Sequence, residues 1–286
     1  MLKQRIITAV VLLILVGGMM FFAPRPLWDA FAALISLLML FEFVRMFAGN
    51  KTFQAAYIII SAALMATAIV YMDKLEQSGA WIIALLILSI AVLIFWLLIV
   101  PVWMWKKWHL RNLFMVWIIG WLLAFPFWTA MVFLRNGSPF LLLGTMMIAW
   151  LSDTGAYFIG RALGKHKLAP LISPKKSVEG AIGGLIAVLI YVGGFCLLAG
   201  NARALIIMLP VGAILTLVGI YGDLLESWFK RCADVKDSGN ILPGHGGVFD
   251  RVDSLSAILS VVFALILILM MLVTLSLLNS FTPLNL

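Results

Sequence analysis

Residues 80–105 read AWIIALLILSIAVLIFWLLIVPVWMW, a stretch without a charged side chain. An apolar segment of about 20 residues is long enough to cross the hydrocarbon core of a bilayer as an α-helix. Apolar and polar residues do not alternate along it, as they would in a strand of a membrane β-barrel. Inside lipid the backbone must satisfy its own hydrogen bonds, which an uninterrupted helix does. The segment therefore predicts a transmembrane helix.

Eight further apolar runs extend this pattern through the chain. Apolar residues make up 64% of the 286 positions and charged residues 11%, against about 25% charged residues in soluble domains. We predict an all-α, polytopic membrane bundle that forms one integrated domain over residues 1–286, with fewer motifs in 1–135 and a catalytic half at 139–279. The expected spans are 6–22, 27–46, 54–72, 80–105, 113–134, 139–160, 178–199, 204–229 and 253–279.

Lysines and arginines indicate the orientation, because basic residues gather in cytoplasmic loops. With the N-terminus in the cytoplasm, sixteen of them fall inside and only Arg25, Lys74, Arg135 and Arg203 fall outside. Nine spans then leave the C-terminus outside and place the two long loops, 161–177 and 230–252, in the cytoplasm. This asymmetry accounts for the net charge of +8, so no nucleic-acid partner is expected.

Acidic residues are scarce, and eight of the twelve lie between positions 153 and 253. A carboxylate inside a span is costly unless it is paired or hydrated. The expected eighth helix ends in GIYGDLLESWFKR, where Asp223, Glu226, Ser227 and Lys230 share one helix face. Such a stripe can hold a divalent cation and place an ammonium group one turn beyond it. The alternative is an ordinary helix end with an Asp223–Ser227 contact and a snorkelling lysine.

The following loop, CADVKDSGNILPGHGGVFDRVDS, is rich in glycine and carries lysine, histidine and arginine. Backbone N–H groups of such a loop can form a concave anion site. Asp250 and Asp253 open the expected ninth helix. Capping of that helix by Asp253 or Ser254, and an Asp250–Arg251 pair, are alternatives to metal binding.

The other long loop, GKHKLAPLISPKKSVEGAIGG, leads through lysines into the expected seventh helix, which we expect Ser177 to cap. A helix N-terminus preceded by lysines attracts phosphate, although these lysines also suit the topology. Glu179 in the first turn suits the helix dipole. In the sixth span, Asp153, Tyr157 and Arg161 recur at four-residue steps, either as a structural pairing or for substrate binding.

Carboxylates for Mg²⁺, several cations and a glycine-rich loop at one membrane face suit phosphoryl or nucleotidyl transfer. The segment SWFKRCADVKDSGNILPGHGGVFDRVD at 227–253 resembles the signature of the phosphatidate cytidylyltransferase (CDP-diacylglycerol synthase) family of bacteria. SDTGAY at 152–157, SPKKSVEG at 173–180 and the N-terminal MLKQRII are also similar to that family. The resemblance covers the whole chain, strongly after about residue 145 and loosely before it.

The resemblance implies a membrane-bound nucleotidyltransferase that converts CTP and phosphatidate to CDP-diacylglycerol and pyrophosphate. It implies Mg²⁺ as the cofactor and leaves open whether a monovalent cation binds as well. It implies an active site on the cytoplasmic face of the inner membrane and is compatible with a homodimer. Asp223, Asp250 and Lys230 would be the catalytic residues, and Asp223 and Asp250 would bind the metal with Asp253 and Glu226 as further ligands. The implied substrate-binding residues are Lys176, Ser177, Ser227, Arg231, Lys236, His245, Gly246, Gly247 and Arg251.

For His245, the residues alone leave open a general acid or base, a phosphate ligand and an ordinary loop histidine. A transporter of a phosphorylated solute is the main rival from another class. Many transporters contain internal repeats and broken helices at mid-membrane. This sequence shows no repeat, and its polar residues gather towards one face. The motifs D-G…A-R…G…D…D of CDP-alcohol phosphotransferases and D-D-x-x-D of polyprenyl transferases are not found in the sequence.

Overall fold

The computed structural model of the chain describes residues 2–71, 74–75, 77–110 and 112–281. Among these residues, eight helices are long and apolar enough to span a bilayer, and the apolar part of the first helix, Ile6–Phe22, is shorter. The helices are α1 (Leu2–Phe22), α2 (Arg25–Phe47), α3 (Lys51–Val70), α5 (Gly79–Ile94), α6 (Val100–Lys106), α7 (Leu113–Gly137), α8 (Pro139–Leu163), α9 (Val178–Leu198), α10 (Leu205–Cys232) and α11 (Phe249–Phe281). A short 3-10 helix, η2 (Ala202–Ala204), precedes α10.

All nine expected spans coincide with helical structure, so the prediction of an all-α polytopic membrane bundle is confirmed. Residue 72, the last of the expected third span, lies outside the described ranges. The fourth span is made of α5, a π-helix η1 (Phe95–Ile99) and α6, which follow one another directly. Pro101 has no N–H to continue the regular helical bonding, and the widened turn before it contains the bond from Val100 N to Phe95 O.

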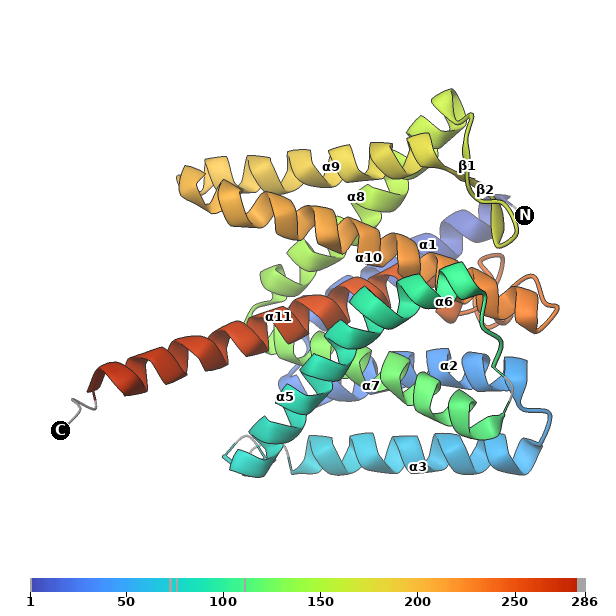
Figure 1. Ribbon diagram of the computed structural model, residues 1–286. Coiled ribbons are helices and arrows are strands. Elements are labelled where there is room, and N and C mark those ends of the chain that lie inside the picture. The colour runs from blue at the N-terminus through green and yellow to red at the C-terminus, as the bar shows by residue number, and fades with distance from the viewer. Residues whose placement is uncertain (1, 72–73, 76, 111, 282–286) are drawn as a thin grey trace.

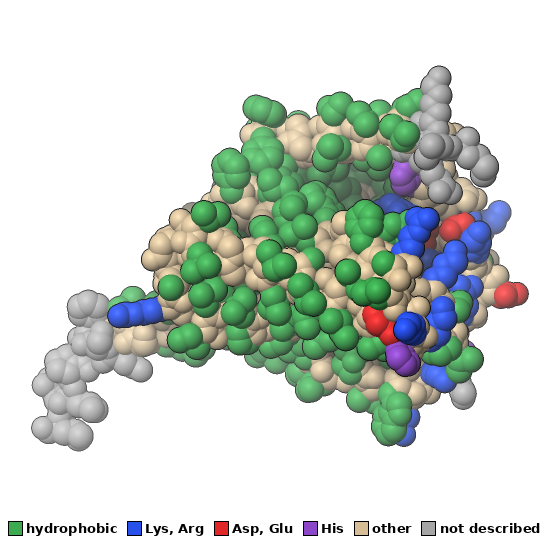
Figure 2. Space-filling model, turned by 90° about the horizontal axis from the view of Figure 1, so that it is seen from above, with side chains coloured by type: hydrophobic (Ala, Val, Ile, Leu, Met, Phe, Trp, Pro, Cys, Tyr) green, Lys and Arg blue, Asp and Glu red, His purple; other side chains and the backbone are tan. Residues whose placement is uncertain are grey.

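The connections alternate between two ends of the bundle (Figure 1). The start of α1, the α2–α3 and α6–α7 connections and the two long loops share one end, and the described end of α11 lies at the other. Figure 2 shows lysines, arginines and acidic side chains gathered at one end of a surface that is otherwise largely hydrophobic. This separation of charge agrees with the arrangement of loops expected from the sequence. Which end faces the cytoplasm stays a prediction.

The centre of the bundle is the first half of α11, where Ala257, Ile258, Leu259 and Val261 have no exposed surface. α11 packs against α10, α7, α5, α8 and α2. Its approach to α10 is close at Gly222, where an added Cβ would lie only 2.7 Å from the carbonyl oxygen of Asp253. Small residues allow this kind of backbone approach between membrane helices. The approach brings the helix face around Asp223 next to the first turns of α11.

Two long connections differ in detail from the predictions. The loop expected at 161–177 contains an antiparallel hairpin of β1 (Lys167–Ala169) and β2 (Ser173–Ser177). α10 continues to Cys232 and α11 begins at Phe249, so the second loop covers only 233–248. Because α11 starts before Asp253, capping by Asp253 or Ser254 is wrong; Asp253 Oδ1 instead accepts a hydrogen bond from Ser254 N (2.8 Å).

Candidate active site

The first group of charged residues, which we call the Asp223 cluster, consists of Asp153, Lys176, Asp223 and Asp253. Asp223 Oδ2 forms an ion pair with Lys176 Nζ at the end of β2. Asp223 Oδ1 accepts a hydrogen bond from Ser227 Oγ one turn along α10 (3.2 Å), which is the contact that the helix periodicity predicts. The β1–β2 hairpin therefore places Lys176 against α10.

Asp153 and Asp253 join this cluster from α8 and α11. Ser254 Oγ donates to Asp153 Oδ2 (3.2 Å), which ties the two helices together. Asp253 lies close enough for its charge to act on those of Asp223, Asp153 and Lys176. Three carboxylates share one lysine here, so ionising all of them would give the cluster an excess of negative charge. A bound cation would reduce their mutual repulsion.

The second group, the Lys230 cluster, consists of Glu226, Lys230 and Asp250. Lys230 Nζ lies 2.6 Å from Glu226 Oε2 and 2.7 Å from Asp250 Oδ1. The side chains of Glu226, Lys230 and Asp250 are 1%, 14% and 6% exposed, so this is a largely buried arrangement. Glu226 and Lys230 belong to the predicted stripe on α10, whereas Asp250 comes from the first turn of α11. The predicted alternative of an Asp250–Arg251 pair is wrong, because Asp250 pairs with Lys230 instead.

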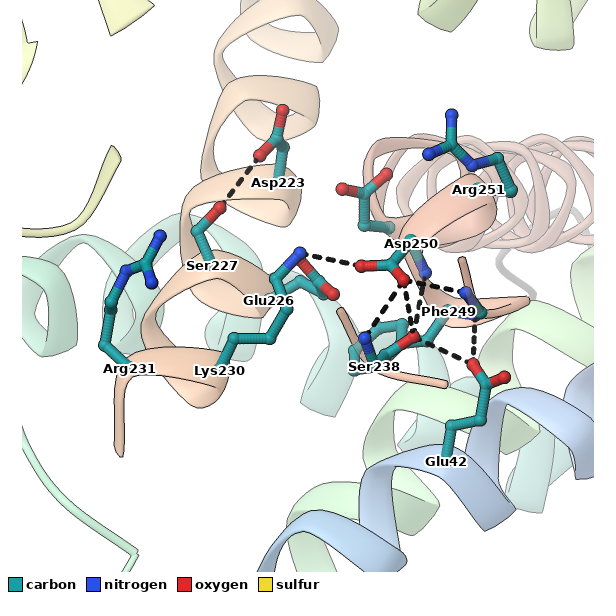
Figure 3. A network of polar contacts seen from close by, with 12 residues as sticks. Glu42, Asp223, Glu226, Ser227, Lys230, Arg231, Ser238, Phe249, Asp250 and Arg251 are labelled. Carbon is teal, nitrogen blue, oxygen red and sulfur yellow. Dashed lines mark hydrogen bonds and ion pairs between the residues drawn. The ribbon is translucent and has the colours of Figure 1, made fainter. Parts of the chain in front are cut away.

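The loop between α10 and α11 holds the other oxygen of Asp250 in place (Figure 3). Asp250 Oδ2 accepts hydrogen bonds from Ser238 N (3.0 Å) and Gly247 N (2.8 Å), and Ser238 Oγ lies 3.0 Å from it. Both oxygens of Asp250 therefore have fixed partners, a lysine on one side and backbone N–H groups on the other. Such an arrangement restricts the rotamer of the carboxylate and the position of Lys230.

Glu42 of α2 is a part of this region that the sequence analysis missed. Its side chain is buried and accepts hydrogen bonds from Ser238 Oγ (2.9 Å), Val248 N (3.0 Å) and Phe249 N (2.8 Å). The available signal was its position inside an apolar span, where a carboxylate needs a partner.

The remaining predicted residues surround the two clusters. Ser177 caps α9 as expected, since its Oγ accepts a hydrogen bond from Gly180 N (3.1 Å). Arg231 Nε donates to the carbonyl of Ile172 in the hairpin (3.3 Å), and Arg251 Nε donates to the carbonyl of His245 (3.0 Å). Lys236 is exposed, and Gly246 and Gly247 lie in the loop next to Asp250. Binding of substrate by these residues stays a prediction.

The row of Asp153, Tyr157 and Arg161 on α8 and the position of Glu179 agree only in part with the predictions from the sequence. Arg161 donates to the hydroxyl of Tyr157 (2.9 Å), as expected for a pairing on one face of α8. Asp153, expected at the other end of that row, instead accepts from Ser254, so it faces α11. Glu179 in the first turn of α9 accepts from the backbone N–H of His166 and lies 2.6 Å from His166 Nδ1. These contacts join the start of the hairpin to α9.

The carboxylates were tested for their fit to Mg²⁺. In the described part of the chain, no three His, Cys, Asp or Glu side chains are gathered as a ready-made metal cage. Mg²⁺ commonly uses only one or two protein carboxylates and completes its shell with water and substrate phosphates. Asp223 and Asp250, on neighbouring helices in Figure 3, carry carboxylate oxygens of that kind, and each of the four oxygens already has a protein partner. The residue types therefore fit a metal that arrives with a phosphorylated substrate and displaces some of these partners.

A largely apolar cavity of about 600 Å³ lies between α6, the hairpin and α10. Its wall on α10 includes Leu217, Tyr221 and Leu224, and Tyr221 and Leu224 flank Asp223 in the sequence. Lys107 also borders the cavity. A charged site and an apolar cavity thus share one stretch of α10.

The fold and this site define a multi-pass membrane protein with a charged centre at one end of its helical bundle. The sequence model of the "Cytidylyltransferase family" matches residues 3–269. A protein of Pseudomonas aeruginosa named phosphatidate cytidylyltransferase is 37% identical over 273 residues, which are 93% of this chain and 97% of that protein. The chain therefore belongs to the cytidylyltransferase family of enzymes, and the resemblance seen in its sequence is confirmed.

Proteins of the same name in Staphylococcus saprophyticus and Staphylococcus aureus match a shorter region more closely. Each is 51% identical over 118 residues, which are 41% of this chain and 45% of the relative.

Proposed function

We infer that this enzyme transfers a cytidylyl group from CTP to phosphatidate, which yields CDP-diacylglycerol and pyrophosphate. The name of the Pseudomonas aeruginosa relative, which matches nearly the full length of the chain, supports this substrate pair. The observation that carries the proposal is that α10 contributes both to the Asp223 and Lys230 clusters and to the wall of an apolar cavity. A reaction between a water-soluble nucleotide and a membrane lipid needs charged and apolar surfaces that adjoin in this way.

The cavity beside α10 would take an acyl chain of phosphatidate. Ile172 of the hairpin and Leu224 of α10 line it. Lys176 lies four residues after Ile172 in the same hairpin, so we expect a lipid whose chain occupies the cavity to bring its phosphate towards Lys176, the partner of Asp223. Lys107 at the border of the cavity offers a second positive charge for that phosphate.

The reaction would be an in-line displacement at the α-phosphorus of CTP. An oxygen of the phosphatidate monoester forms the new P–O bond, and the bond to the bridging oxygen breaks with its electron pair leaving on pyrophosphate. The monoester is largely ionised near neutral pH, because a second phosphate pKa is about 6. No protein nucleophile is required, so the residues act by positioning the phosphates and offsetting their charge.

The cations of the site have distinct supports. Lys176 and Lys230 are each held by carboxylates, which aim their ammonium groups before substrate arrives. Arg231 and Arg251 are held by backbone carbonyls. We assign phosphate binding to these four side chains together with Lys236, whose exposed position suits a contact with the entering nucleotide.

Asp223 and Asp250 would hold Mg²⁺, with Asp253 and Glu226 as further ligands or supports. The metal would supply neutralisation of phosphate charge and orientation of the phosphate oxygens. Since CTP is a cytosolic nucleotide and the relatives are bacterial, we place this end of the bundle at the cytoplasmic face of the inner membrane. The basic residues gathered at one end support that orientation.

The test is the conversion of labelled CTP by the purified protein in vesicles or detergent with phosphatidate and Mg²⁺. We expect label in a lipid fraction that co-migrates with CDP-diacylglycerol, together with release of pyrophosphate. Omission of phosphatidate or addition of EDTA should stop both, and Mg²⁺ in excess of EDTA should restore them. Absence of lipid label, or accumulation of unmodified CTP or phosphatidate inside sealed vesicles, would contradict the proposed reaction.

A further inference from the structure

Glu42 occupies an unusual position for a carboxylate. It lies in the N-terminal half of the chain on α2 and is 1% exposed. The next residue, Phe43, packs its ring against those of Phe229 on α10 and Phe249 on α11, with centroids 5.2 and 6.3 Å apart. α2 therefore touches the point where α10 ends and α11 begins. Glu42 enters that contact with a buried carboxyl group beside these aromatic rings.

The carboxylate satisfies the first N–H groups of α11. These groups have no acceptor within their own helix, and a side chain just before the helix usually supplies one. Here Gly246, Gly247 and Val248 precede Phe249 and carry no side-chain oxygen. Glu42 Oε1 and Oε2 accept from Val248 N and Phe249 N instead, across more than 200 positions of sequence. The positive end of the helix dipole also favours a carboxylate at this place.

Ser238 connects Glu42 to the Lys230 cluster. Its Oγ lies 2.9 Å from Glu42 Oε2 and 3.0 Å from Asp250 Oδ2. Its backbone N–H donates to Asp250, and the N–H of Asp250 lies within 3.3 Å of its hydroxyl oxygen. The contacts therefore run from Glu42 through Ser238 to Asp250, and from Asp250 to Lys230 (Figure 3).

Two glycines show how closely the loop is fitted around the carboxylate. A Cβ at Gly239 would lie 2.3 Å from Glu42 Oε1, and a Cβ at Gly247 would lie 2.3 Å from Glu42 Oε2. An apolar side chain at position 42 could fill the same volume, but it would leave buried N–H donors without an acceptor. Such unsatisfied groups are strongly unfavourable. The contact thus gives loop 233–248 a defined position as well as filling space.

We propose that Glu42 is a positioning residue for the transfer reaction, holding loop 233–248 and Asp250 through Ser238 so that Lys230 is aimed at the substrate phosphates. The inference rests on the proposed function for the role of Lys230. The ordering of the loop by Glu42 can be tested by hydrogen exchange without any assay of activity. It assigns a task to the N-terminal half of the chain, which otherwise contributes few polar residues to the site.

The test compares Glu42→Gln, Ser238→Ala and the double variant with the unmodified protein. Peptides that cover 233–249 should exchange backbone hydrogen for deuterium faster in each variant, whereas peptides from α3 should be unchanged. The rate of CDP-diacylglycerol formation should fall by about 10- to 100-fold for Glu42→Gln, the usual range when a supporting hydrogen bond behind a reactive group is lost. Leu34→Ala is the matched control, because Leu34 is an exposed residue of the same helix and takes no part in these hydrogen bonds. Its loop should exchange like that of the unmodified protein.

The double variant separates positioning from general stability. If Glu42 acts through Ser238, the double variant should be no slower than the slower single variant, within about twofold. Multiplication of the two single effects, or an unchanged exchange rate of loop 233–249 in Glu42→Gln, would overturn the proposal. If Glu42→Gln does not insert or fold, the test rests on Ser238→Ala alone. Normal hydrogen exchange and normal turnover in that variant would overturn the proposal. An unmodified protein that forms no CDP-diacylglycerol would refute the proposed function, while the exchange data would still judge the positioning.

Discussion

Replacement of Lys230 by methionine would remove the ammonium group that lies between Glu226 and Asp250. Methionine retains much of the length of the lysine stem, so the main change is electrostatic. The two carboxylates, at 2.6 and 2.7 Å from Lys230 Nζ, are 1% and 6% exposed and would lose their cation in a site with little water. We expect Lys230→Met to abolish product formation and also to destabilise the protein.

The magnitude follows from the burial of the three groups. Loss of one partner from a buried ion pair costs about 3–5 kcal/mol, because a charge is left without compensation. Glu226 should account for most of this, since its Oε1 has no hydrogen-bond partner among the described residues, whereas Asp250 keeps its backbone donors. At roughly 2–4 °C per kcal/mol, the melting temperature would fall by about 10 °C.

The assay is thermal unfolding in detergent followed by tryptophan fluorescence, which the eleven tryptophans of the chain make sensitive. A second change, Glu226→Leu in the Lys230→Met background, should restore at least half of the lost stability. Replacement of a buried ion pair by apolar residues is often neutral or stabilising. The double variant should remain inactive. An unchanged melting temperature in Lys230→Met, or a further decrease on adding Glu226→Leu, would refute the electrostatic reasoning.

Two further predictions concern the metal site and the loop. Asp223→Asn should lower CDP-diacylglycerol formation by about 100-fold, because the variant would lose a carboxylate that holds the cation offsetting transition-state charge, and near-normal turnover would remove Asp223 from the site. The side chains of Asp223 and Lys176 in their ion pair are 29% and 25% exposed. The free energy of unfolding should therefore change by less than about 1 kcal/mol, and the melting temperature should change little. Gly247→Ala should destabilise the protein by about 1–3 kcal/mol through overpacking, because its Cβ would lie 2.1 Å from Ser238 Oγ. Gly194→Ala, which would meet open space among the described residues, should stay within about 0.5 kcal/mol of the unmodified protein in the same thermal assay.

Local periodicity predicted a large part of the structure. Apolar runs placed the helices, because burial in a bilayer depends on the composition of each segment by itself. The spacing of Asp223 and Ser227 predicted their contact, and Ser177 was recognised as a helix cap, because both are interactions within one helix or at its start. The last apolar run was placed from residue 253, whereas α11 begins four residues earlier, at Phe249. The acceptors for its first N–H groups come from α2, so no capping residue marks that start in the local sequence.

The partners of individual charges could not be predicted in the same way. An ion pair between Asp250 and its sequence neighbour Arg251 was one prediction, yet Asp250 pairs with Lys230 across the loop. Lys176 was assigned to phosphate from its position before a helix, and the hairpin brings it to Asp223 as well. Each of these pairings depends on the angle and separation of helices, which the order of residues along one segment does not specify.

Hydropathy and helical spacing act within each segment, so they were sufficient to predict a helical membrane protein, and the motifs identified the family. The division of the charges into a Lys176–Asp223 group and a Glu226–Lys230–Asp250 group, and the contact of Glu42 with the second, depend on how the helices pack. A buried carboxylate takes whichever donors the packed helices bring within reach, and for Glu42 those donors lie about 200 residues away along the chain.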